Sequence, residues 1–280
     1  MKHFFDVVDG KSVLVIAIAC LFTYLCIQFG FVFDIPTDLI GIAIVFPIVF
    51  SINAAYVRRE KALTHFSEIK GSALGIRMAH LHWVNSDTLN HLKILDNLYA
   101  SFFEKMSTYL KTKSPSSKTY DEIILHFRDI SLSHEELRNL GLSTSEISRL
   151  NQYLRRMIIE FENINNIKKY RTPNSLRAYS KVFLNAFPIV FAPFFAFIAS
   201  TNSHLFGFSL AIMYGLVLTS LDNIQDDLED PFDGIGSDDI SLEFPDMLSP
   251  ELIQEKRDVF QGGAGPESDV PNNGIEAVCK

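Results

Sequence analysis

The chain contains a stretch of 22 residues, Ser12 to Phe33, that carries no charged side chain. An α-helix of that length extends roughly 33 Å, enough to cross the hydrocarbon core of a bilayer. A signal peptide is the alternative interpretation, but its apolar core has only about 7–15 residues and ends at a small-residue cleavage site. The run here is longer and ends in Phe31-Val32-Phe33-Asp34. We therefore interpret it as a transmembrane helix.

Three further apolar runs are long enough to be membrane spans. The second, Leu39 to Val57, follows a short turn at residues 34–38 that contains a helix-breaking proline. The third, Val182 to Ser200, is separated from the fourth, Leu205 to Leu221, by the polar turn Thr201 to His204. Closely spaced apolar runs indicate helical hairpins. The sequence thus predicts an all-α, multi-pass membrane protein with about four transmembrane helices.

The second pair of runs has two irregular features. Pro188 and Pro193 lie inside the third run, which is therefore expected to be kinked or split. The fourth run has only 17 residues, near the lower limit for a span. Both features are compatible with a hairpin that is packed against other helices.

Positive charges mark one side of the predicted membrane domain. They follow the second run and precede the third, whereas the two short turns contain neither Lys nor Arg. By the positive-inside rule, both termini and residues 58–181 are expected to be cytoplasmic. The residues that set this orientation are Arg58, Arg59, Lys61, Lys70, Lys168, Lys169, Arg171, Arg177 and Lys181.

The region between the two hairpins is expected to be helical. Residues 62–111 are amphipathic, and KTKSPSSK at 111–118 is a loop. Ser133 with Glu136, and Ser143 with Glu146, match the capping box that starts a helix. The second box predicts a helix from about Thr144 to Ile167. One stripe of that helix is apolar and fits an ordinary helix–helix core: Leu150, Leu154, Met157, Ile158 and Phe161.

Motifs for enzymatic chemistry are absent from the sequence, which has no nucleotide-binding loop, no G-x-S-x-G and no H-E-x-x-H. His80 and His82 would point about 200° apart on a helix, so they make a poor metal site and are expected to be packing or surface residues. The three cysteines, Cys20, Cys26 and Cys279, have no spacing that suits zinc or a disulfide framework. We do not expect an enzyme.

Acidic residues are concentrated after the fourth run. The formal net charge is −8, and ten acids between Asp222 and Asp246 are not interrupted by Lys or Arg. Nucleic acid is therefore not an expected partner. The segment fits a cation site, or an acidic helix end that docks on basic inner helices of the same or a neighbouring subunit.

The second apolar run carries a stripe of three large side chains. Ile42, Phe46 and Phe50 recur every four residues, so they lie on one face of a helix and drift by about 40° per step. We call them the neck stripe. They face either lipid or a neighbouring helix, or they form a hydrophobic constriction if several copies surround an axis. Pro47 lies within the stripe and leaves the carbonyl of Ala43 without its helical donor.

Several segments resemble the bestrophin family. Residues 42–56, followed by Arg58-Arg59, resemble its second transmembrane helix, and Tyr170-Arg171-Thr172-Pro173 is similar to its Thr-Pro entry to the third span. The most specific similarity is the acidic helix end followed by a Pro-Phe turn and further acids: Asp226-Asp227-Leu228-Glu229-Asp230-Pro231-Phe232, then Gly236, Asp238, Asp239 and Leu242. The order of elements agrees over about residues 10–245.

The resemblance implies a homopentameric, anion-selective channel with its pore on the five-fold axis. It places the family's hydrophobic neck at Ile42, Phe46 and Phe50. Chloride is the expected permeant anion, with bicarbonate as an alternative. One departure is Val57-Arg58-Arg59, which stands where many members carry an aromatic pair.

The resemblance also raises the question of calcium. Asp227 and Asp230 match positions of the calcium clasp of animal members, and Asp238 or Asp239 would complete it. The turn from Asp233 to Ser237 is longer than in those members, and calcium needs six to eight oxygen ligands. Calcium is therefore a candidate cofactor, and no other is expected.

The expected organisation has five parts. They are residues 1–57 with the first hairpin, the cytoplasmic helical region 58–181, the second hairpin 182–221, the acidic segment 222–245, and a tail, 246–280, whose Gly-, Pro- and polar-rich composition predicts disorder.

Two alternatives to the channel remain. One is a non-conducting membrane scaffold whose cytoplasmic helices bind a partner, and the other is a membrane-bound enzyme that holds a divalent metal in its acidic cluster.

Overall fold

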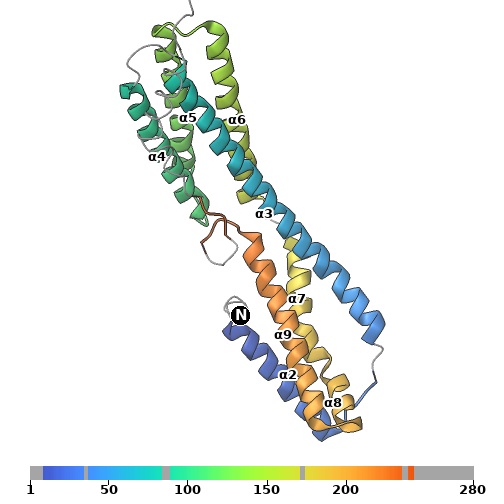
Figure 1. Cartoon of the computed structure of the whole chain (residues 1–280). Coiled ribbons are helices and arrows are strands. Elements are labelled where there is room, and N and C mark those ends of the chain that lie inside the picture. The colour runs from blue at the N-terminus through green and yellow to red at the C-terminus, as the bar shows by residue number, and fades with distance from the viewer. Residues whose placement is uncertain (1–8, 35–36, 84–88, 171–173, 235–238, 243–280) are drawn as a thin grey trace, which may run out of the picture. The chain divides into compact units, whose positions relative to one another are not determined.

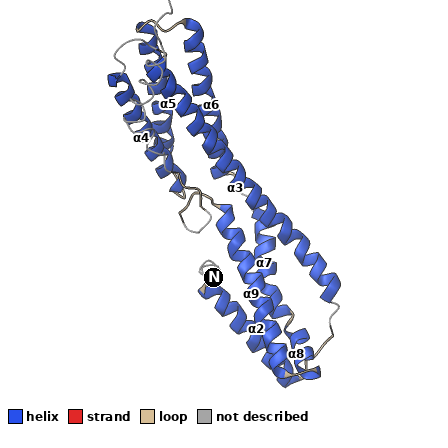
Figure 2. Cartoon of the chain, in the orientation of Figure 1, coloured by secondary structure: helices blue, strands red, loops and turns tan. Residues whose placement is uncertain are grey.

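The computed structural model describes residues 9–34, 37–83, 89–170, 174–234 and 239–242. Within these ranges the secondary structure is entirely helical, without a strand (Figure 2). The predicted all-α class is confirmed. The predicted tail, 246–280, lies outside the described residues.

The first apolar run forms helix α2, Gly10–Phe29. Its N-cap is Asp9, whose carboxylate accepts a hydrogen bond from the backbone N–H of Ser12 at 2.8 Å. It ends at Gly30, which has φ +70° and closes the helix in the left-handed conformation that glycine adopts without strain. This glycine explains why the helix stops before Phe33, where the uncharged run ends.

The second apolar run is the beginning of a much longer helix, α3, Thr37–His82. It continues from the apolar segment into the charged segment without a break, so the predicted boundary at Val57 is not a structural boundary. The amphipathic stretch predicted at 62–111 is divided between α3 and α4, Leu89–Lys111.

The second half of α3 packs with α4 and α6 (Thr144–Lys169), and α5 (Ser117–Asn139) packs in turn with α4 and α6. The capping prediction for α6 is confirmed, because Ser143 Oγ accepts from the Glu146 N–H at 3.4 Å. The prediction for Ser133 is wrong. Ser133 lies inside α5, where its hydroxyl donates to the Ile130 carbonyl at 2.7 Å. The predicted α6 stripe is buried at Leu150, Leu154, Met157 and Phe161, and Ile158 is only partly buried.

The third apolar run is split as predicted, into α7 (Asn174–Val190) and α8 (Ala192–Thr201). Pro188 lies inside α7, and Pro193 occupies the first turn of α8, where its missing N–H has no helical partner to lose. Helix α9, His204–Glu229, returns after a short turn. Gly207 allows this close return, because a Cβ there would lie 2.5 Å from the Ala199 Cβ.

The apolar helices share a core of their own. Helix α2 packs against α7, α8 and α9, and α3 also contacts α7 and α9 (Figure 1). The buried cluster includes Ile48 from α3, Leu184 from α7 and Leu218 from α9. Among the described residues, three segments are long and apolar enough to cross a membrane: Gly10–Phe29, Arg177–Thr201 and His204–Glu229. The second predicted span, Leu39 to Val57, is the beginning of α3 and is not one of these three.

Candidate functional site

The neck stripe lies on the first part of α3. Phe46 and Phe50 are 60% and 61% exposed, and their ring centroids are 6.2 Å apart. The side chain of Ile42 lies outside the described residues. Within the described part of the chain, no helix covers most of either ring, so Phe46 and Phe50 do not belong to the buried core of a single chain.

The opposite face of α3 explains this exposure. Ile48, Ser51 and Ala55 are almost completely buried, and Ile48 belongs to the core cluster with α7 and α9. Anchoring one face in the core turns Phe46 and Phe50 outward at a fixed angle. The two rings are thus held on a surface that lipid or a second chain would cover.

Three carboxylates at the end of α9 form a second constellation. Asp222, Asp226 and Glu229 are spaced by four and three residues, so they lie on one face of the helix. We call them the acidic row. Asp222 and Glu229 are almost completely buried. Buried carboxylates require charge partners, and each of the three has one.

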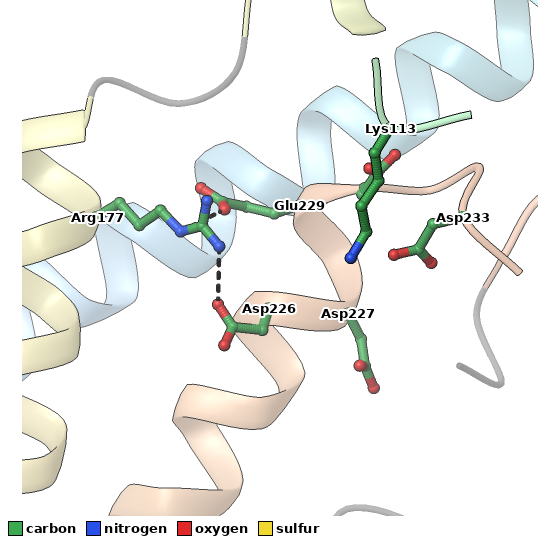
Figure 3. Close-up of a pocket in the computed structure, with 7 residues that line it drawn as sticks. Lys113, Arg177, Asp226, Asp227, Glu229 and Asp233 are labelled. Atoms are coloured by element: carbon green, nitrogen blue, oxygen red, sulfur yellow. Dashed lines mark hydrogen bonds and ion pairs between the residues drawn. The ribbon is translucent and has the colours of Figure 1, made fainter. Parts of the chain in front are cut away.

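The partners of the acidic row come mainly from α7. Lys181 Nζ lies 2.7 Å from Asp226, and Arg177 Nε lies 2.9 Å from Glu229. Figure 3 shows the Arg177 guanidinium between Asp226 and Glu229, with its Nη2 3.4 Å from the Asp226 carboxylate. Asn185 donates to Asp222 at 2.9 Å. Arg177, Lys181 and Asn185 also follow each other at four-residue spacing, so the two helices present matching rows.

Asp222 at one end of the acidic row, and Asp230 directly after its other end, are each paired with a lysine from another part of the chain. Lys11, at the beginning of α2, forms an ion pair with Asp222. Lys168, near the end of α6 and almost completely buried, lies 3.6 Å from Asp230. The segment after α9 is also packed, since Phe232 is buried and the Ile240 N–H donates to the Pro231 carbonyl at 3.0 Å. The end of α9 therefore connects the apolar helices to the bundle formed by the second half of α3 with α4, α5 and α6.

The candidate calcium residues do not fit a calcium site in the part of the chain that is described. A cavity of about 250 Å³ is lined by Asp227, Asp230 and Asp233, but also by Lys113 and Arg177 (Figure 3). Within the described ranges, no three His, Cys, Asp or Glu side chains are grouped so that they could hold a metal ion. Asp238 lies outside those ranges, and Asp239 joins no such group. The contacts with Arg177, Lys181 and Lys168 fit the other interpretation of this segment, an acidic helix end that docks on basic helices of the same chain.

The apolar helices and the neck stripe define an α-helical membrane protein. No protein-family model matches the chain, and no curated protein matches it. Solved structures do match. The chain is similar to a point mutant of a bacterial bestrophin homologue from Klebsiella pneumoniae, with TM-score 0.70 and 17% identity over 83% of this chain and 95% of that one.

Two further structures agree with this similarity. Another point mutant of the Klebsiella pneumoniae homologue has TM-score 0.70 and 14% identity, over 90% of this chain and 96% of its own. A third structure of the homologue has TM-score 0.68 and 15% identity, over 91% and 98%. The chain has the bestrophin fold, as its sequence resemblance implied.

Proposed function

We propose that the chain assembles into a homopentameric anion channel, with the neck stripe of each copy facing the symmetry axis. The observation that carries the proposal is the outward, fixed position of Phe46 and Phe50 on a helix whose other face is buried. The bestrophin fold supports the same arrangement. A closed ring of copies would cover these rings without creating an open-ended filament.

The chemistry of the neck is suited to an anion. Phenylalanine offers an ion no hydrogen bond, so the barrier is one of wetting, set by the diameter of the ring. The edge of an aromatic ring carries partial positive charge and favours an anion over a cation. The acidic row would oppose anion passage if it were free, but its carboxylates are paired with Lys11, Arg177 and Lys181. Chloride is the proposed permeant ion, and bicarbonate is the alternative.

The assembly state and the activity are tested together. In mild detergent we expect a native mass of five times the 31.7 kDa of one chain. In liposomes we expect the purified protein to carry chloride and to exclude potassium, with protein-free liposomes as the control. A pentamer without flux would support the non-conducting scaffold instead. A clean monomer or dimer would contradict the proposal.

The proposed topology places both termini and the helical region 58–181 in the cytoplasm. In a background where Cys20, Cys26 and Cys279 are replaced by serine, a single cysteine is introduced at Ser114 or at Asn202, both exposed. Ser114 lies between α4 and α5, and Asn202 lies between α8 and α9. An impermeant thiol reagent is expected to label Asn202→Cys in intact cells and Ser114→Cys only after the membrane is opened. The reverse pattern would invert the topology.

A further inference from the structure

Two histidines are buried in the bundle formed by the second half of α3 with α4, α5 and α6, away from the neck stripe and the acidic row. The proposed topology places this bundle in the cytoplasm. His80 of α3 and His134 of α5 are each 1% exposed, and their ring centroids are 6.3 Å apart. Histidine is the side chain whose charge ordinarily changes between about pH 5 and 8. A buried pair of them is therefore a place where acidity can act on packing.

The hydrogen bonds fix which nitrogen of each ring carries the proton. Ser133 uses its hydroxyl proton to reach the Ile130 carbonyl, so its oxygen accepts from His80 Nε2–H at 3.4 Å. Asn151 Oδ1 accepts from His134 Nδ1–H at 3.0 Å. The remaining nitrogens are His80 Nδ1 and His134 Nε2, which are buried and have no hydrogen-bond partner among the described residues. Each of these two nitrogens carries a lone pair that can accept a proton.

A proton on either nitrogen would create a buried cation that forms no ion pair among the described residues. Charged groups on neighbouring turns of all four helices are already engaged with one another. These pairs are Arg77 with Asp96, His91 with Glu136, Glu135 with Arg138, and Glu146 with Arg149. Burial and the neighbouring His134 and His91 lower the pKa of His80 to about 3. Burial also lowers the pKa of His134, although Asn151 and Glu135 oppose it.

We propose that His80 and His134 make the cytoplasmic bundle an acid-sensitive switch, closed when both rings are neutral and opened between α3 and α5 when either ring takes a proton. The direction follows from linkage. A histidine whose pKa is lowered by folding stays neutral in the closed bundle, but takes a proton below about pH 6.5 once the bundle opens. Opening therefore becomes easier as the pH falls from about 6.5 toward the pKa in the closed state. This acid sensitivity is expected whether or not the protein conducts ions.

Hydrogen exchange of the full-length protein in detergent tests the switch. After correction for intrinsic exchange chemistry, the opening constant of amides near residues 76–82 and 130–137 is expected to rise about 30-fold from about pH 7.5 to about pH 5 through His80, and further in the same direction through His134. His80→Gln should remove about 30-fold of that dependence. His82→Gln is the matched control, because His82 is exposed on the same helix, and it should leave the dependence intact.

A second measurement needs no variant. In NMR of protein labelled at its histidine rings, His80 should remain neutral at about pH 5, and burial should hold the pKa of His134 below the ordinary value of a histidine. Opening that is independent of pH, or an equal effect of His80→Gln and His82→Gln, would overturn the proposal. A His80 ring that is already protonated at about pH 5 within the closed bundle would overturn it as well.

Discussion

Replacing Arg177 with alanine is expected to destabilise the protein by about 3–5 kcal/mol, because it leaves a buried carboxylate without its charge partner. Arg177 Nε is 2.9 Å from Glu229, whose side chain is only 2% exposed. The same substitution removes the contact of Arg177 with Asp226. The free energy of unfolding in detergent, from denaturant titration at fixed protein concentration, is the quantity to measure.

Two comparisons show whether the effect arises from the buried charge. Arg138→Ala is the matched control, since Arg138 pairs with Glu135 at 2.9 Å but both side chains are about half exposed. Its expected cost is about 0–1 kcal/mol. Adding Glu229→Gln to Arg177→Ala should recover much of the lost stability by removing the orphaned charge. If the double variant is as unstable as the sum of the two single variants, the pair is not coupled.

Replacing Ile42, Phe46 and Phe50 together with alanine is expected to increase resting chloride flux in liposomes about tenfold, which corresponds to lowering the barrier by about 1.4 kcal/mol. The physical reason is that smaller side chains widen the ring and let it wet more easily. Selectivity for anions over cations should change less, because helix ends and basic residues in the wider parts of the pore also contribute to it.

The neck experiment has a competing outcome and a control. If the stripe packs against neighbouring helices in the assembly, each lost phenylalanine should cost stability instead, about 3–5 kcal/mol if it is well packed. Phe22→Ala with Phe29→Ala removes two exposed rings from α2 and should leave the flux unchanged. A triple variant that assembles normally but conducts no more than the parent would show that these residues are not the gate.

Much of the fold could be predicted from hydrophobic runs, prolines and charge. The split at Phe191 and the start of α6 at Ser143 depend on local chemistry, which a sequence displays directly. The continuity of α3 through residues 57–61 could not be read in this way. At these residues the composition changes from apolar to charged. The sequence therefore suggested that a membrane helix ends at Val57 and a separate segment follows, whereas the backbone forms one continuous helix.

The candidate sites were predictable to different degrees. The four-residue spacing of Arg177 and Lys181 and the matching acids on α9 were visible in the sequence, although their pairing requires knowing that α7 and α9 are neighbours. The pair formed by Lys11 and Asp222 joins opposite ends of the chain and had no local signal. His80 was expected to be a packing or surface residue, and its burial against another helix depends on tertiary structure alone.

The packing of α2 against α7, α8 and α9 has a consequence for biosynthesis. During synthesis, α2 finds its main partners only after about 200 more residues have been translated, which takes roughly 10–40 s at 5–20 residues per second. During that interval Lys11 cannot form its ion pair, because Asp222 has not yet been made. A chain interrupted before α9 would therefore leave α2 without the helix that carries its ion-pair partner.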